Sequence, residues 1–262
     1  MKTNRSRLSA VEVVALCILM SVATFYVTSL VHARQMEERL WSGHPSLQEL
    51  EPLRKKYGPE RSTQNFEEWI IRDYFQDRRG GTFLDVGANH YQRENNTYYL
   101  ETSLGWSGIA IDALPEFGPD YVAHRPRTRF VALFASDTVG GKVQFFVPPG
   151  NNLVASSSRE FTIREGEEGR AIEVPTTTLN AVLDQAQISR LDFMSMDIEL
   201  AEPKALAGFD IDRFQPAFVC IEAHPDVRQE ILNYFASHRY VLAGKYLRAD
   251  PLNLYFERHF QQ

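Results

Sequence analysis

Five short apolar segments, which alternate with stretches of helical character, constrain the fold of this chain more than any other feature. The segments are TFLDV (82–86), GIAID (108–112), RFVAL (129–133), DFMSMD (192–197) and AFVCIE (217–222). Strands that are apolar on both faces are typical of a parallel sheet covered by helices on both sides. The pattern therefore predicts an α/β fold built on an open, mostly parallel sheet.

Further segments complete the predicted sheet. Val143–Val147 and Ile172–Val174 are expected to form an added antiparallel pair around a polar loop. Later in the sequence, Tyr240–Ala243 and Asn253–Phe256 have the pattern of two strands joined by a turn-rich stretch. An open parallel sheet that closes in such an antiparallel pair has a Rossmann-like layout. The spacing of apolar residues over 66–75 also predicts a helix that packs onto this domain.

Composition and charge exclude one class of partner. The chain has 262 residues, of which 44% are apolar, so it can bury the core of one large domain. Its net charge is -6, and it has no long basic stripe of the kind that binding to a phosphate backbone requires. We therefore expect no nucleic-acid partner.

The segment Val13–Val31 contains 19 residues without a charge, which is close to the length that a helix needs to cross a bilayer. It predicts a single-pass membrane anchor, although a secretory signal peptide cleaved near Ala33 is an open alternative. Residues 1–33 would then form a cytoplasmic tail and transmembrane anchor, residues 34–65 a polar stalk rich in proline, and residues 66–262 the globular domain. The side of the membrane on which this domain lies stays open, because the flanking basic residues differ little in number.

The end of each of the first three predicted strands carries residues suited to a nucleotide-like cofactor. In FLDVGAN (83–89), Gly87 allows the backbone to approach a ligand, and Asn89 is one of the few residue types that tolerate left-handed torsions. Asp112 ends the second strand and can accept hydrogen bonds from both hydroxyls of a ribose. FASD (134–137) follows the third strand and is suited to flank an adenine ring. Each motif alone is also compatible with a cap or a turn, and a nicotinamide enzyme would normally show G-x-G-x-x-G at the first loop.

The fourth and fifth predicted strands end in ionisable side chains, namely Asp197, Glu199, Glu222 and His224. With a cofactor over the first strands, the substrate would lie over these ends, so the four side chains are candidates for proton removal and substrate positioning. We predict Asp197, Glu199 and His224 as catalytic residues, and a purely structural His224 is the alternative. The same three residues could instead hold a divalent cation, but their spacing shows no compact ligand motif, so we predict no metal site.

Six separated blocks of the chain resemble the FkbM methyltransferase family. They are FLDVGAN, NNTYYLE (95–101), LGWSGIAIDALPE (104–116), VPTTTLNAVL (174–183), DFMSMDIELAEPKALAGFD (192–210) and CIEAH (220–224). The resemblance covers roughly residues 66–257. It implies a class I methyltransferase fold, the cofactor S-adenosyl-L-methionine, and O-methylation of hydroxyls on natural products and glycans. With the strand-end motifs, it leads us to predict these cofactor contacts: Asp85, Gly87, Ala88, Asn89, Asp112, Ser136 and Asp137.

Residues 66–262 are therefore predicted to be a methyltransferase domain that methylates a hydroxyl of a saccharide, glycolipid or related metabolite, at a membrane. The alternative is a non-catalytic binding or trafficking module that keeps the methyltransferase fold. Asp85, Gly87 and Asp112 favour the enzyme. Leu200 favours the alternative, because it stands where the family's D-x-E-G-x-E block has glycine.

Overall fold

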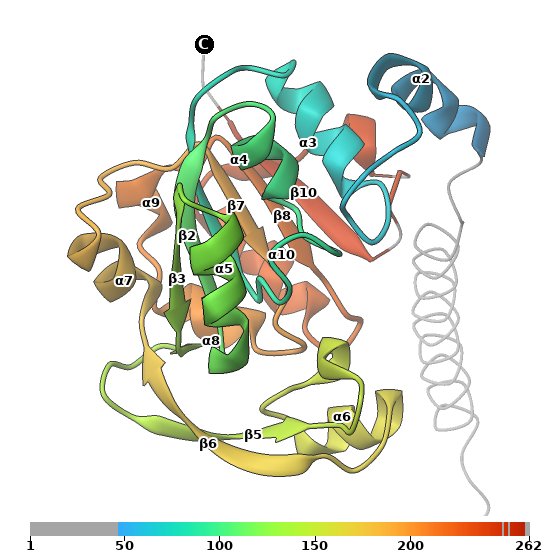
Figure 1. Cartoon of the computed structure of the whole chain (residues 1–262). Helices are drawn as coiled ribbons and strands as arrows, with labels where there is room; N and C mark the ends of the chain where they lie inside the picture. The colour runs from blue at the N-terminus through green and yellow to red at the C-terminus, as the bar shows by residue number, and fades with distance from the viewer. Residues whose placement is uncertain (1–46, 248, 251, 260–262) are drawn as a thin grey trace, which may run out of the picture. The chain divides into compact units, whose positions relative to one another are not determined.

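The computed structural model of this protein describes residues 47–247, 249–250 and 252–259. Its largest element is a seven-stranded sheet with the strand order β3-β2-β1-β7-β8-β10-β9 (Figure 1). Strand β10 runs antiparallel to β8 and β9, and the remaining pairs are parallel. The strands are β1 (Thr82–Val86), β2 (Ser107–Asp112), β3 (Thr128–Ala132), β7 (Phe193–Met196), β8 (Phe218–Glu222), β9 (Tyr240–Leu242) and β10 (Asn253–Arg258). The predicted mostly parallel α/β sheet with an antiparallel C-terminal pair is confirmed.

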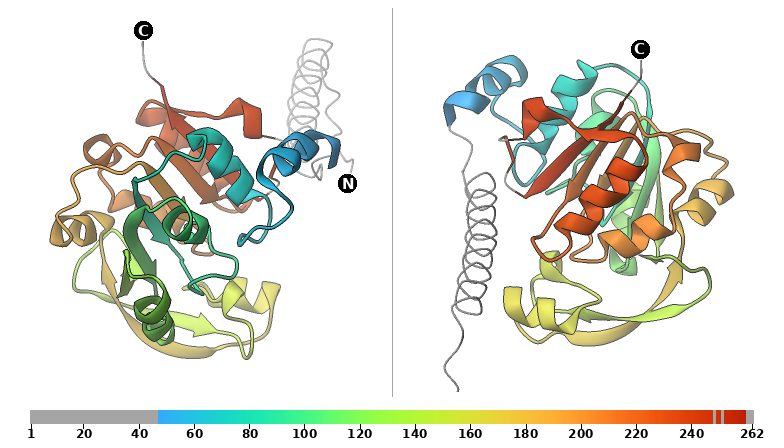
Figure 2. Two further views of the ribbon diagram at one scale, coloured as in Figure 1. Left: turned by 45° about the horizontal axis from the view of Figure 1, so that its top comes forward. Right: turned by 180° about the vertical axis from the view of Figure 1, so that it is seen from behind.

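Helices cover both faces of this sheet, which is why β7 and β8 are buried along their whole length. Helices α3, α4 and α5 lie on the face that Figure 1 presents, and α8 and α10 lie on the other face (Figure 2). The helices are α2 (Leu47–Tyr57), α3 (Glu67–Phe75), α4 (Tyr98–Thr102), α5 (Gly118–His124), α6 (Arg159–Glu165), α7 (Leu179–Gln185), α8 (Glu202–Ala207), α9 (Ile211–Phe214) and α10 (Arg228–Ser237), with short 3₁₀ turns η1 (Pro115–Phe117), η2 (Asn152–Val154) and η3 (Gly244–Tyr246).

Helix α3 packs on the sheet as the sequence predicts. Its Ile70 and Phe75 are buried in one cluster with Trp106, Phe193 and Phe218. The Phe75 ring meets the Trp106 ring edge to face, with centroids 4.9 Å apart, a geometry that aromatic pairs favour. This cluster anchors the amino-terminal edge of the domain to the central strands.

The stalk expected over residues 34–65 is wrong for its described part. Residues 47–57 form helix α2, whose Leu50 and Tyr57 are buried in the same cluster as α3. The hydroxyl of Tyr57 donates a hydrogen bond to Asp73 Oδ1 at 3.1 Å. The prediction failed because charged residues and Pro52 mask an apolar stripe at positions 50, 53 and 57, which is helical spacing.

A second, smaller sheet lies beyond the carboxyl ends of the central strands (Figure 1). Strands β5 (Lys142–Val147) and β6 (Arg170–Thr177) pair antiparallel in it, which confirms the predicted added pair. Strand β4 (Phe134–Ala135) was not predicted; it follows β3 directly and pairs parallel with β6. The chain that leaves the central sheet after β3 is thereby tied to the hairpin.

None of the helices in the described residues is long and apolar enough to span a membrane. The predicted anchor over Val13–Val31 lies outside the described residues.

Candidate active site

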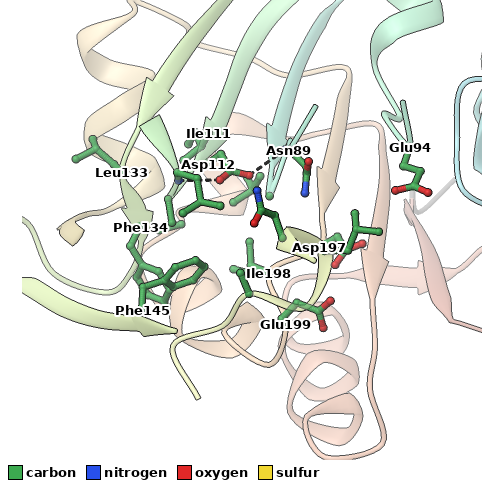
Figure 3. Close-up of a pocket in the computed structure, with 18 of the residues that line it drawn as sticks. Asn89, Glu94, Ile111, Asp112, Leu133, Phe134, Phe145, Asp197, Ile198 and Glu199 are labelled. Atoms are coloured by element: carbon green, nitrogen blue, oxygen red, sulfur yellow. Dashed lines mark hydrogen bonds between the residues drawn. The ribbon is translucent and has the colours of Figure 1, made fainter. Parts of the chain in front are cut away.

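A pocket with an empty volume of about 730 Å³ opens at the carboxyl ends of β1, β2, β3 and β7 (Figure 3). Parallel strands present their carboxyl ends at one edge of a sheet, which is where open α/β folds bind ligands. This volume includes solvent at the open mouth of the pocket. Its lining includes Gly87, Asn89, Asp112, Asp197 and Glu199, which the sequence predicts as site residues.

The first loop of the pocket depends on glycine at position 87. Gly87 has a φ of +82°, and a Cβ on it would overlap the backbone carbonyl oxygen of Asp197. The N–H groups of Gly87 and Ala88 donate to the carbonyl of Ile111 at 2.9 and 3.0 Å. Asn89 takes a φ of +46°, so the left-handed torsion expected of it is confirmed. The loop thus brings bare backbone to the pocket, where only glycine fits.

Asp112 joins this loop to the next one. Its Oδ2 accepts a hydrogen bond from the Asn89 N–H at 2.9 Å, and its Oδ1 accepts one from the Leu114 N–H at 2.8 Å (Figure 3). Burial raises the pKa of this carboxyl to about 6, and the two backbone hydrogen bonds oppose the rise. Each carboxylate oxygen has a second lone pair that can accept from a ligand hydroxyl.

One side of the pocket is apolar. Phe134 and Phe145 lie there with ring centroids 6.0 Å apart, across from Asp197 and Glu199 (Figure 3). They belong to a buried cluster that also contains Leu114, Val174 and Ala155. A flat apolar ring can be buried against such a surface, while the acidic side chains face the opposite end of the pocket.

Four predicted cofactor contacts lie outside the pocket lining. Asp85 is buried and accepts a hydrogen bond from Thr97 Oγ1 at 2.8 Å, and Ala88 packs in a buried cluster. Ser136 is buried and donates to Asp137 Oδ1 at 3.0 Å, whereas Asp137 is exposed. In this structure none of these four residues lines the pocket.

Other lining residues were not predicted. Gln64 comes from the segment expected to be a stalk, Glu94 comes from the loop before α4, and Asn152 and Leu153 come from the loop between β5 and β6. No motif marks them in the sequence, because only the folded chain brings these loops over the strand ends.

At the acidic end of the pocket, the ends of β7 and β8 come together. His224 Nε2 lies 3.2 Å from Glu199 Oε2 and also 3.2 Å from Glu222 Oε2. Asp197 and Glu199 line the pocket, whereas His224 is not part of the lining. Glu202 is fully buried below, where its Oε1 accepts the Ile198 N–H at 3.0 Å.

The side chains at this end of the pocket differ in the cause of their pKa shifts. The hydrogen bond with Glu199, together with the close carboxylate of Glu222, raises the pKa of His224 to about 10. Burial, together with neighbouring carboxylates, raises the pKa of Asp197 well above its ordinary value, and that of Glu202 to about 8. A histidine that is protonated at neutral pH donates a proton rather than accepts one, so His224 is not suited to act as the base.

The backbone is strained next to these carboxylates. Glu199 and Leu200 have φ values of +53° and +75°, a region that costs a non-glycine residue roughly 1 to 2 kcal/mol. Ser156 Oγ donates a hydrogen bond to the Glu199 carbonyl at 2.7 Å. The turn therefore keeps the torsion that suits glycine although leucine occupies it, and Glu199 still reaches the pocket.

Comparison with known proteins gives one family match. The model of the methyltransferase FkbM domain matches residues 85–242. No curated protein matches the chain.

The solved structures that match this chain share little sequence with it, and the TM-scores of the three described here lie below 0.5. A TehB-like SAM-dependent methyltransferase from Corynebacterium glutamicum is 15% identical, with a TM-score of 0.42 over 87% of this chain and 99% of that one. The 1,6-didemethyltoxoflavin-N1-methyltransferase of Burkholderia thailandensis, solved with 1,6-didemethyltoxoflavin and S-adenosylhomocysteine, is 12% identical, with a TM-score of 0.38 over 97% and 93%. An O-methyltransferase from Bacillus cereus in complex with SAH is 10% identical, with a TM-score of 0.39 over 80% and 87%.

Proposed function

Because the chain belongs to the FkbM methyltransferase family, we propose that it transfers a methyl group from S-adenosylmethionine to a hydroxyl of a saccharide, glycolipid or related metabolite. The observation that supports this most is that one pocket combines a ribose-type acceptor, Asp112, with two carboxylates, Asp197 and Glu199, at its far end. Asp112 suits the ribose of the cofactor, and the two carboxylates suit the hydroxyl of an acceptor.

The residues present fit the cofactor. Gly87 offers backbone where a side chain would overlap Asp197, so the chain can approach a ligand closely there. Asp112 has lone pairs left for two ribose hydroxyls. Phe134 and Phe145 offer the apolar surface that an adenine ring requires. When bound, the sulfonium cofactor supplies an electrophilic methyl group.

The protein then has to orient the acceptor and remove its proton. Asp197 and Glu199 are the carboxylates that line the pocket, and a hydroxyl placed between them and the cofactor can lose its proton to one of them. Asp197 is the better candidate, because its backbone lies directly against Gly87. The proposed location at a membrane rests on the segment Val13–Val31 alone.

Full-length protein in detergent, supplied with S-adenosylmethionine labelled on its methyl group, provides the test. The acceptors are a panel of free monosaccharides and monoglycosyl lipids, and labelled products are separated from the cofactor. We expect the wild type to label a panel member and Asp197→Asn to lose at least 100-fold in turnover while it binds the cofactor with unchanged affinity. Asp210→Asn is the matched control, since Asp210 is exposed and caps α9 through the Arg213 N–H.

Two results would contradict the proposal. Near wild-type turnover by Asp197→Asn removes the assigned base. A wild type that does not bind S-adenosylmethionine in a calorimetric titration favours the non-catalytic module instead.

A further inference from the structure

Three ligand-type atoms converge at the acidic end of the pocket. They belong to Glu199, Glu222 and His224, and all lie within 4.8 Å of one another. The two distances from His224 Nε2, to Glu199 Oε2 and to Glu222 Oε2, are both 3.2 Å. Neighbouring ligands of an ion with bonds of about 2.1 Å lie roughly 3.0 Å apart in an octahedral site and about 3.4 Å apart in a tetrahedral one. Both distances from His224 Nε2 therefore match the separation of ligands that share one ion.

Protein hydrogen bonds do not satisfy this cluster. Glu222 is only 8% exposed, and its Oε2 has no hydrogen-bond partner among the described residues although His224 Nε2 is 3.2 Å away. An imidazole Nε2 carries at most one hydrogen, so it cannot serve Glu199 and Glu222 equally well. A buried carboxylate oxygen without a partner is costly, and such atoms are uncommon in folded proteins. Glu222 Oε2 therefore lacks the compensation that a bound cation would supply.

Two further carboxyl groups lie near the cluster, and a cation would stabilise them as well. Asp197 lies at the end of the neighbouring strand, and Glu202 is fully buried with its Oε2 also unpartnered among the described residues. Asp197 and Glu202 thus add two carboxyl groups near the two that flank the imidazole. Buried charges in proteins are normally paired or bound to a metal ion.

We propose that Glu199, Glu222 and His224 bind one divalent first-row transition-metal ion, of which Mn²⁺ and Zn²⁺ are the best candidates. The donor set supports this choice, because imidazole suits transition metals, whereas Mg²⁺ and Ca²⁺ prefer oxygen ligands alone. The site replaces the expectation of no metal, which rested on ligand spacing in the sequence. The fold brings position 199 next to positions 222 and 224 because β7 and β8 are neighbours in the sheet.

The position of the ion deepens the proposed function and, in this respect only, rests on it. Glu199 lines the pocket, so an ion held there has an open side toward the acceptor. A metal-bound hydroxyl loses its proton more easily than a free one, and the ion also fixes the position of its oxygen. Asp197 then remains free to accept the proton.

Binding of the ion can be measured without cofactor or acceptor, which separates this proposal from the methyltransferase assignment. Full-length protein is stripped with a chelator and titrated with Mn²⁺, with free Mn²⁺ followed by its electron paramagnetic resonance signal. We expect one ion per chain, displacement by Zn²⁺, and much weaker competition by Mg²⁺. Glu222→Gln and His224→Gln should each weaken binding by at least tenfold.

Controls distinguish loss of the metal site from a general effect of the substitutions. Glu230→Gln, an exposed change in the first turn of α10, should bind Mn²⁺ like the wild type. Because Glu222 is buried, circular dichroism must show that its variant is folded, and the more accessible Glu199→Gln gives a second test of the same site. The proposal is overturned if the wild type binds no Mn²⁺ or Zn²⁺, or if all three ligand variants bind like the wild type.

Discussion

Gly87 and Asp197 lie so close together that the backbone of one excludes a side chain on the other. The Asp197 N–H also donates to the carbonyl of Val86 at 2.9 Å. The loop that suits the cofactor and the loop that carries the candidate base are thus held at a fixed separation by backbone atoms. In a displacement reaction this separation matters, because small errors in alignment lower the rate greatly.

Gly87→Ala should abolish cofactor binding and lower the melting temperature. The new methyl group would overlap the Asp197 carbonyl oxygen. The alanine would also have to adopt a φ of +82°, which is unfavourable for any residue other than glycine. Gly140→Ala is the control, since Gly140 has a φ of +77° but no atom near its Cβ position. It should cost only about 1 kcal/mol of stability and leave binding unchanged. Equal behaviour of the two variants in thermal unfolding and cofactor titration would show that Gly87 is not in a restricted position.

Asp112→Ala should weaken the binding of S-adenosylmethionine by 100-fold or more. It removes the acceptor for the ribose hydroxyls, at about 1.5 to 3 kcal/mol per charged hydrogen bond, and it frees the N–H groups of Asn89 and Leu114. Asp210→Ala is the control, because it removes an exposed helix cap and lowers stability without touching the pocket. Calorimetry decides the matter, and unchanged affinity in Asp112→Ala would refute the ribose assignment.

Leu200→Gly should be more stable than Leu200→Ala by about 1 kcal/mol. Both variants lose the same leucine contacts, but only glycine adopts a φ of +75° without strain. At Leu206, inside α8, the order should reverse, because glycine is unfavourable within a helix. Urea denaturation of the four variants gives both differences. The same order at the two positions would mean that Leu200 is not strained.

Stability should depend on pH through Glu67. Burial, together with the nearby charge of Asp250, raises the pKa of Glu67 from 4.5 to about 7. Between these values the folded state holds a proton that the unfolded state releases, so this contribution is complete below pH 4.5 and is lost as the pH rises through 7. The unfolding free energy of the wild type should therefore fall relative to that of Glu67→Gln between pH 5 and pH 8, by up to about 3 kcal/mol. Denaturation at both pH values measures this, with Glu230→Gln as control, and a pH-independent difference contradicts it.

The sequence predicts the central sheet well because its strands are continuous apolar runs. It misses β4, which has two residues, and α2, whose apolar stripe is interrupted by charge. The side chains at the strand ends, such as Asp112 and Asp197, are placed correctly because parallel strands end at one edge.

The roles of His224, Asn152 and Leu153 cannot be predicted from the sequence in the same way. His224 looks like a base in the sequence, since its ordinary pKa is near neutrality. In the folded chain, the pairing of β7 with β8 brings Glu199 and Glu222 close to His224. These two carboxyl groups raise the pKa of His224. Asn152 and Leu153 reach the pocket through the course of a hairpin, which no local pattern encodes.

Most of the pocket lining comes from two separate parts of the chain. Gly87, Asp112 and Asp197 belong to the central sheet, whereas Phe145 and Leu153 belong to the β5–β6 hairpin and its loop. The hairpin can change in length and sequence without moving the strand ends. Changes in the loop between β5 and β6, whether they arise by evolution or by design, can therefore alter the entrance of the pocket. The residues at the strand ends stay the same.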